Sequence, residues 1–223
     1  MEYKNILAID SSSNRLKIGM LSGGDRVVKI DELVEQSHSQ IIIEKINSVF
    51  KSSGVDKMSL SAVVVNLGPG SFTGLRIGIA AAKGMVSALG IRIVGINHFE
   101  MAAYKLRNES DDIYIIVQFK KDQFFVVPVN SGSYYLQRLE VMKLEHLSDF
   151  CKKNRFAIIG LDGQLESGHE LDYTNRIMYD ASDLLELGTL KLEKGEDGDL
   201  AEMEPLYIQK SQAEINFELK NRK

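Results

Sequence analysis

The sequence has little material for cysteine or metal chemistry. Of its 223 residues one is a cysteine, Cys151, so an internal disulfide and a cluster of thiolate metal ligands are excluded. Its neighbours are a phenylalanine and a lysine, which favours a buried structural cysteine over a reactive nucleophile. The four histidines are His38, His98, His146 and His169, and no two have the spacing of helix-borne metal ligands. We therefore expect no metal site and no catalytic residue of this kind.

Net charge and long apolar runs are also scarce. The formal net charge is −4 and the pI about 5.7, so the chain as a whole has no electrostatic reason to bind phosphate backbones. No stretch approaches the ~20 apolar residues that span a bilayer. Residues 1–5 run into a strand-like segment without an apolar signal region. We expect a cytoplasmic protein that contacts no membrane and reaches nucleic acid only through another subunit.

The first hundred residues predict three strands, a helix and then a strand–helix–strand unit. Short connections between the first three apolar segments, 6–9, 16–20 and 27–34, predict an antiparallel meander. The pattern Ser37-x-x-Gln40 predicts a capping box that opens a helix, and Gly54 stands where that helix ends. Strands at 62–67 and 91–96, with a helix at 75–89 between them, should be parallel and buried on both faces.

The pattern begins again near residue 113. Segments 113–117, 124–129 and 134–141 predict a second three-strand meander, followed by a helix at 146–153, a strand at 156–160 and a helix at 183–193. This repeated layout is that of ribonuclease-H-like and actin-like ATPase domains. We predict an α/β fold with two tandem domains of this kind, residues 1–104 and a smaller, divergent domain over 105–223. The fold alone does not define the chemistry.

A glycine-rich junction between strand and helix lies at residues 66–78. Gly68 and Gly70 flank a proline, which predicts a tight turn with close backbone approach. Ser71 or Thr73 can cap the following helix, whose free first-turn amides suit an anion or a carboxylate from another chain. The ending Gly-Lys-Ser/Thr of a phosphate loop is absent. From chemistry alone, a turn that lets the chain reverse sharply is the simpler interpretation.

The end of the first strand adds polar residues to this candidate site. Asp10 and the serines after it resemble the first phosphate loop of a sugar kinase or ATPase, and a strand-end turn with an Asx bond explains them equally. Arg76 lies in the first helical turn, where the helix dipole disfavours a cation unless an acid, a bound anion or solvent relieves it. The candidate anion- or nucleotide-binding residues are Asp10, Ser11, Ser12, Gly68, Gly70, Ser71, Thr73 and Arg76.

Small residues form two neighbouring stripes along the helix at 75–89. Gly74, Gly78 and Ala82 lie four apart on the first stripe, and the second stripe consists of Ala81, Gly84 and Ala88. Interior glycines cost roughly 0.5–1 kcal/mol each relative to alanine, so close approach of another backbone should offset them. That backbone can belong to the chain's own sheet or to a partner helix. The predicted partner interface combines these stripes with the apolar face of the preceding helix: Ile42, Ile46, Val49, Gly74, Gly78, Ala81, Ala82 and Met85.

Several segments resemble the first domain of TsaB (YeaZ-type) proteins. They are Ile6–Ser12, His38-Ser39, Gly68–Gly78, Ala80–Gly90 and Ile93–Gly95, so the resemblance covers roughly residues 5–104. In the second half it rests on Ile159-Gly160-x-Asp162-Gly163 and Glu204–Ile208. Two positions depart from the family pattern. Gln118–Lys121 replaces a turn resembling Asp-Ala-Arg-Arg, and Gln209 replaces an arginine.

The resemblance implies a non-catalytic role. TsaB proteins pair with the paralogue TsaD, which holds the metal and ATP and transfers threonylcarbamoyl to adenosine 37 of tRNAs reading codons that begin with A. The small ATPase TsaE docks on that pair. A member would have no cofactor of its own, with weak nucleotide binding left open. It would contact TsaD through the helices near 41–49 and 74–88, reach tRNA through the complex, and form a homodimer when isolated.

Three alternatives are weighed against this role. A weak actin-like ATPase or kinase needs a second phosphate loop, but Phe119-Lys120-Lys121 offers neither an acid nor a glycine turn. A metallopeptidase needs paired metal ligands, which the histidine spacing does not provide. A homodimeric interaction protein differs only in its partner. Lysine clusters such as Lys120 and Lys121, and the basic tail 220–223, are normally solvated surface, and a contact with tRNA is left open.

Overall fold

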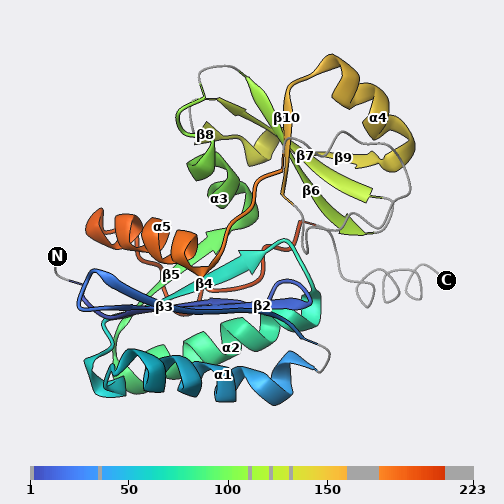
Figure 1. The fold of residues 1–223 in the computed structure, drawn as a ribbon. Helices are drawn as coiled ribbons and strands as arrows, with labels where there is room; N and C mark the ends of the chain where they lie inside the picture. Colours follow the sequence, from blue (N-terminus) through green and yellow to red (C-terminus); the bar gives the residue numbers. More distant parts are fainter. Residues whose placement is uncertain are drawn as a thin grey trace.

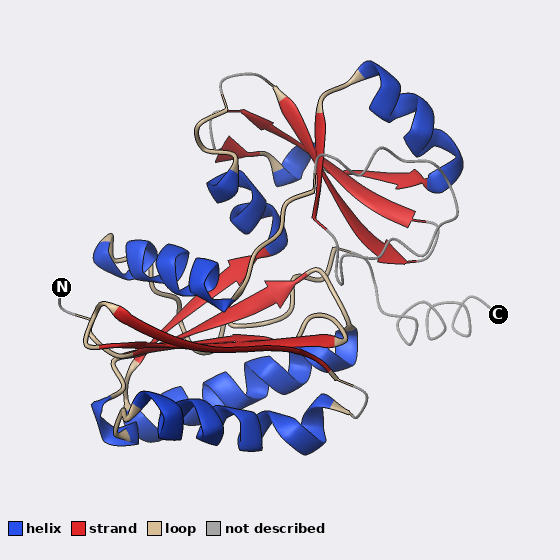
Figure 2. Ribbon diagram, viewed as in Figure 1, coloured by secondary structure: helices blue, strands red, loops and turns tan. Residues whose placement is uncertain are grey.

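The fold contains two β-sheets with helices packed against them (Figure 1, Figure 2). The computed structural model describes residues 3–34, 37–109, 112–120, 123–130, 133–159 and 176–208. Several sequence predictions fall outside these residues: those on Gly160, Asp162, Gly163, His169, Gln209, Lys121 and the tail 220–223. The same holds for the side chains of Phe119 and Lys120.

The first sheet has the strand order β3-β2-β1-β4-β5. The strands are β1 (Ile6–Asp10), β2 (Arg15–Ser22), β3 (Arg26–Leu33), β4 (Ala62–Gly68) and β5 (Arg92–Asn97). Short turns make β1, β2 and β3 antiparallel, whereas β4 and β5 run parallel to β1. The predicted meander and the predicted parallel strands are both confirmed, and the order is that of a ribonuclease-H-like domain.

Helices cover both faces of this sheet (Figure 1). Helices α1 (His38–Ser53) and α2 (Phe72–Leu89) pack on one face, and α5 (Ala181–Glu193) packs on the other. Successive β1 residues point to opposite faces. Leu7 and Ile9 therefore join the core beneath α1 and α2, while Ala8 joins the core beneath α5.

The helix ends follow the predicted capping in part. The Ser71 hydroxyl accepts a hydrogen bond from the Gly74 amide at 3.2 Å, which confirms one predicted cap of α2. Gly54 ends α1 in the left-handed conformation, with φ at 72°. The capping box at Ser37 is not formed, because the Ser37 hydroxyl pairs with the hydroxyl of Ser39 at 2.8 Å. That prediction was wrong.

Helix α2 bears on the prediction that no stretch approaches the ~20 apolar residues of a membrane span, because it has 18 residues and a largely apolar composition. Among the described residues it is the one helix whose length and composition would allow it to cross a membrane. Its inner face packs against β4, with Leu75, Ile79 and Val86 in the core. The apolar composition of α2 thus serves at least in part to cover the first sheet.

A short helix that the sequence pattern did not predict leads out of the first sheet. Helix α3 (His98–Lys105) follows β5 without an intervening turn, and the Asn97 side chain caps it by accepting from the Glu100 amide at 2.9 Å. Eight residues are too few for a clear helical period, because they make little more than two turns.

The second sheet has the order β10-β6-β7-β8, with β9 also paired to β7. Its strands are β6 (Ile113–Lys120), β7 (Gln123–Asn130), β8 (Ser133–Tyr134), β9 (Glu140–Lys143) and β10 (Phe156–Ile159). Helix α4 (Leu144–Lys153) precedes β10, as predicted. The single strand expected at 134–141 is wrong. A 3₁₀ turn at Leu136–Arg138 divides it, since the Leu139 amide bonds within the turn instead of across the sheet.

The chain returns from the second sheet to the first, and residues 176–208 are called the crossing segment below. The Ile177 amide donates to the carbonyl of Ile158 in β10 at 2.8 Å, after which α5 packs on the first sheet. The Gly198 amide then bonds the β5 carbonyl of Ile93 at 2.9 Å. The predicted division at residue 104 separates the two sheets along the sequence and stays a prediction, but in space α5 covers the first sheet.

Candidate functional site

The carboxyl ends of the parallel strands in the first sheet meet at a buried polar cluster. Asp10 ends β1, Asn66 lies near the end of β4, and His98 follows β5. In open α/β sheets this edge is where ligands bind. Lys17 of β2 and Tyr179 of the crossing segment complete the cluster, and all five side chains are at least nine-tenths buried.

Asp10 accepts four contacts from the chain itself. The Ser12 amide and hydroxyl donate to Oδ1 at 2.9 and 2.6 Å. The Tyr179 hydroxyl donates to Oδ2 at 2.7 Å, and the Lys17 ammonium lies 3.4 Å from the same oxygen. The ammonium is also 4.4 Å from the centre of the Tyr179 ring, within range of a cation–π contact. A cation and a phenol therefore already cover this carboxylate.

These contacts determine the ionisation of the two acidic groups, the Asp10 carboxyl and the Tyr179 phenol. Burial alone would raise the pKa of Asp10, but the Lys17 charge, His98 and the Ser12 hydrogen bonds hold it well below its ordinary value. Burial and the adjacent Asp10 charge raise the pKa of Tyr179 well above its ordinary value. At neutral pH the cluster therefore holds an ionised carboxylate beside a neutral phenol.

His98 is the remaining titratable member of the cluster. Its Nε2 lies 2.7 Å from the Tyr179 hydroxyl and 3.1 Å from the Asn66 amide nitrogen. Burial lowers the pKa of His98 to about 4; Asp10 and the Pro69 carbonyl oppose this shift, and Lys17 adds to it. His98 is therefore neutral at pH 7, when the cluster holds one anion and one cation.

Glycines in the predicted glycine-rich junction seat α2 directly on the loop after β1. A Cβ at Gly74 would overlap the Ser11 carbonyl, and a Cβ at Gly70 would overlap the Ser12 carbonyl. The Ser71 amide donates to the Ser12 carbonyl at 2.6 Å. Close approach within the chain, which was predicted for Gly68 and Gly70, therefore explains Gly70 and Gly74.

The structure separates the candidate anion-binding residues into two groups. Asp10, Ser11, Ser12 and Gly68 are buried, Gly70 is half-buried, and Ser71, Thr73 and Arg76 are exposed at the start of α2. The Ser11 hydroxyl donates to the Gly74 carbonyl at 2.8 Å and so faces the helix. Lys17, Asn66, His98 and Tyr179 were not predicted as site residues from the sequence. A lysine inside the apolar alternation of β2 was the one available signal for the first of them.

The predicted partner interface needs a correction. Ile42, Ile46, Val49, Gly74, Gly78 and Ala82 are buried inside the chain, and Ala81 and Met85 are half-buried. A Cβ at Gly78 would overlap the Ser11 hydroxyl. The first small-residue stripe therefore faces the chain's own sheet, and a bulky residue at Gly78 would disturb the fold itself. In the second stripe, a Cβ at Gly84 would meet nothing within 4 Å.

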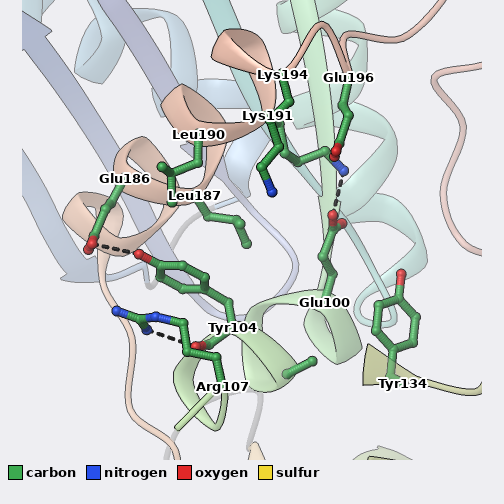
Figure 3. Close-up of a pocket in the computed structure, with 11 residues that line it drawn as sticks. Glu100, Tyr104, Arg107, Tyr134, Glu186, Leu187, Leu190, Lys191, Lys194 and Glu196 are labelled. Atoms are coloured by element: carbon green, nitrogen blue, oxygen red, sulfur yellow. Dashed lines mark hydrogen bonds and ion pairs between the residues drawn. The ribbon is translucent and has the colours of Figure 1, made fainter. Parts of the chain in front are cut away.

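An open pocket of about 620 Å³ lies between α3 and α5 (Figure 3). Two of its charged side chains pair with each other, and two more contact Tyr104. The Tyr104 hydroxyl donates to Glu186 at 2.5 Å, Lys191 pairs with Glu100, and the Arg107 guanidinium stacks 4.1 Å from the Tyr104 ring. Burial and the Glu186 hydrogen bond raise the pKa of Tyr104 to about 12. The contacts across this pocket join α3 to α5.

Cys151 and the acidic groups give no further site. Burial raises the pKa of the Cys151 thiol to about 11, so the thiolate is scarce at neutral pH, in line with the structural role predicted from the sequence. Among the residues that the structure describes, no three His, Cys, Asp or Glu side chains are grouped so that they could hold a metal ion.

Comparison with known proteins gives the family. The family model of TsaD, tRNA N6-adenosine threonylcarbamoyltransferase, matches residues 30–160, more than half of the chain. The TsaB proteins, named for tRNA threonylcarbamoyladenosine biosynthesis, are similar to this chain over part of its length. That of Bacillus subtilis is 30% identical over 120 residues, 54% of this chain and 52% of the relative. That of Haemophilus influenzae is 24% identical over 128 residues, 56% of this chain and 53% of the relative.

The chain belongs to the TsaB (YeaZ) family. The solved structure of YeaZ from Pseudomonas aeruginosa has the same fold, with a TM-score of 0.70 at 20% identity, covering 92% of this chain and 100% of that one. The chain spans about half the length of the curated TsaB relatives it matches. The family resemblance drawn from the first-domain segments is thus confirmed.

The neutral His98 predicts a pH dependence of stability. An unfolded histidine titrates near pH 6.5 and the folded one near 4, so the unfolded chain binds one more proton between these values. The free energy of unfolding should fall as the pH is lowered from about 6.5 to about 4, by up to ~1.4 kcal/mol per pH unit from this group. His98→Gln should remove that part of the slope, whereas replacing the exposed His146 should retain it.

Urea unfolding of the three proteins at about pH 4.5, 5.5 and 7 measures the slopes. Equal slopes in the parent and His98→Gln would contradict the assignment of a buried, neutral histidine.

Proposed function

We propose that this TsaB-family chain is a non-catalytic subunit in tRNA threonylcarbamoyladenosine biosynthesis. It pairs in the cytoplasm with a TsaD-type paralogue, on which a TsaE-type ATPase docks, and reaches tRNA through that complex. The names of its relatives support the pathway. The observation that carries the non-catalytic role is the filled strand-end cluster at Asp10.

The cluster leaves Asp10 without a free face for a cofactor. A divalent cation beside Asp10 would have to displace the Lys17 ammonium, and a phosphate would have to displace the Tyr179 hydroxyl. Displacing either would leave buried polar groups without partners, which costs about 1–3 kcal/mol for each neutral group and more for a charge. The ATP and the metal of the reaction are therefore assigned to the TsaD-type partner.

The partner surface is assigned to the outer side of α1 and α2, which lie side by side as the layer beneath the first sheet in Figure 1. Ile43 of α1 is 58% exposed, and the small residues Ala80, Gly84 and Ala88 of α2 are also exposed. This docking face comprises the half-buried or exposed Ile41, Ile43, Ile77, Ala80, Ala81, Gly84, Met85 and Ala88. Monomeric proteins seldom expose an apolar face of this kind to solvent, so the isolated chain should form a homodimer through the docking face.

No observation favours the other functions over this one. A metallopeptidase would need a ligand group that the described residues do not form. A kinase or ATPase would need access to Asp10, which is fully buried. A homodimeric interaction protein would use the same docking face, so binding to the paralogue separates it from the proposed function.

A charge at Gly84 tests the docking face. Gly84→Glu adds a carboxylate where the chain leaves open space, so the fold should persist. Affinity for the TsaD-type paralogue should fall at least tenfold, about 1.4 kcal/mol, and the homodimer should dissociate. Calorimetry and sedimentation measure the two effects. Glu193→Arg, an exposed charge change on α5 at the opposite face of the sheet, is the matched control. If Gly84→Glu bound the paralogue and itself as tightly as the parent does, the docking face would be wrongly assigned.

The filled cluster also predicts that the isolated chain does not hydrolyse ATP. Phosphate release with magnesium and ATP should stay at the level of a buffer blank, because Asp10 is already paired with Lys17. Turnover near a typical enzyme rate, about 1–10 per second, that disappears in Asp10→Ala would overturn the non-catalytic role.

A further inference from the structure

An exposed cluster of two aromatic rings and an arginine lies beside the first two turns of α2, which begins at Phe72 and so places Arg76 in its second turn. Phe72 is 38% and Tyr207 is 46% exposed, with ring centres 5.4 Å apart. The Arg76 guanidinium carbon lies 3.9 Å from the centre of the Phe72 ring, and its Nε donates to the Tyr207 hydroxyl at 3.2 Å. We call Phe72, Arg76 and Tyr207 the arginine cluster.

Neighbouring residues of the crossing segment hold Tyr207, and with it the arginine cluster, in place. The crossing segment brings Tyr207 from the far end of the described chain, and the adjacent Leu206 amide bonds the Leu67 carbonyl at 2.8 Å. Pro205, two residues before the tyrosine, is buried. Side chains fixed in this way lose little further freedom when a partner binds, so the cluster is preorganised for recognition.

The charge of Arg76 is not balanced within the described part of the chain. Its contacts there are the ring of Phe72 and the hydroxyl of Tyr207, and neither is an anion. The first turn of α2 contains no acidic residue, and the helix dipole adds positive potential at this end. A local positive site therefore stands on a chain whose net charge is −4. Of the three means of relief expected from the sequence, an acid of the chain itself is absent among the described residues.

We propose that the arginine cluster binds an aspartate or glutamate side chain of the paralogous subunit. A guanidinium presents a planar fork that matches a carboxylate, and stacking on Phe72 fixes the plane of that fork. Arginine and tyrosine are the residue types that anchor protein interfaces. The cluster lies on the same helix as the docking face, one turn before Ala80, so a partner covering that face would reach it. The assignment rests on the proposed function.

The chemistry favours a carboxylate over RNA. Protein affinity for nucleic acid grows with the number of phosphates contacted, and it needs several cations along a backbone. The described cluster offers one cation on an acidic chain. A single carboxylate, bound by two parallel hydrogen bonds between flanking aromatic rings, matches the geometry of one guanidinium.

Charge reversal at Arg76 tests the proposal by calorimetry with the purified TsaD-type paralogue. Arg76→Glu should weaken binding about thirtyfold, and Arg76→Lys about fivefold, because an ammonium keeps the charge but loses the fork. Arg26→Glu, the same change on the exposed edge strand β3, should bind like the parent. Thermal unfolding checks that each variant is folded, and Arg76→Lys remains informative if Arg76→Glu is not.

The outcomes separate this proposal from the proposed function. Parent-like affinity of Arg76→Glu, together with loss of binding by Gly84→Glu, would overturn the arginine cluster and leave the docking face intact. Parent-like affinity of both variants would overturn both. If Arg76→Glu kept the paralogue but the assembled complex lost affinity for tRNA, the bound anion would be a phosphate and the carboxylate assignment would be wrong.

Discussion

The buried contact between Asp10 and Lys17 is the constraint on which the rest of the site depends. An ionised carboxylate without access to water is tolerated only with a cation and hydrogen-bond donors around it. Lys17 supplies the cation, and Ser12 and Tyr179 supply donors. The Tyr179 hydroxyl in turn receives a hydrogen bond from Asn66 at 3.0 Å. The charge of one side chain thereby fixes residues from β1, β2, β4 and the crossing segment.

A second contact of Asp10 joins the crossing segment to the first strand. Tyr179 and Asp10 are 169 residues apart in sequence. Tyr179 stands two residues before the start of α5, the helix that packs on the first sheet. Asp180 caps α5 and pairs with Lys29 of β3, which fastens the start of that helix at the surface. With α5 on one face of the sheet, α1 and α2 form the layer left open to a partner. Closure of the strand ends and exposure of that layer are the two observations that support the proposed accessory role.

Much of the first domain could be predicted because its signals are local. Short turns between apolar segments define the meander, and a serine before a helix defines a cap at Ser71. The apolar period of α2 also gives its small-residue stripes, but not which surface each stripe meets. Gly78 proved to face Ser11 of the chain itself, while Gly84 faces open space. Which surface a stripe meets depends on where β1 ends in three dimensions, and the spacing of residues along one helix does not carry that information.

The polar cluster could not be predicted for a related reason. Lys17 and Tyr179 meet only after the crossing segment has returned from the second sheet. Lys17 carries no local signal beyond its place in the apolar alternation of β2, and Tyr179 carries none. The break in the strand at 134–141 was missed because its two halves keep a strand-like composition on both sides of the turn at Leu136–Arg138.

A double-mutant cycle at Asp10 and Lys17 tests most directly whether this buried pair closes the site. Unfolding free energies are measured for Lys17→Met, Asp10→Asn and the double variant. Lys17→Met alone should lose about 3–5 kcal/mol, because it leaves a buried carboxylate unpaired. The double variant should lose clearly less than the sum of the single variants, with a coupling of about 1–3 kcal/mol. Additive losses, like those expected for the exposed pair Asp149 and Lys152, would contradict the central role of the contact.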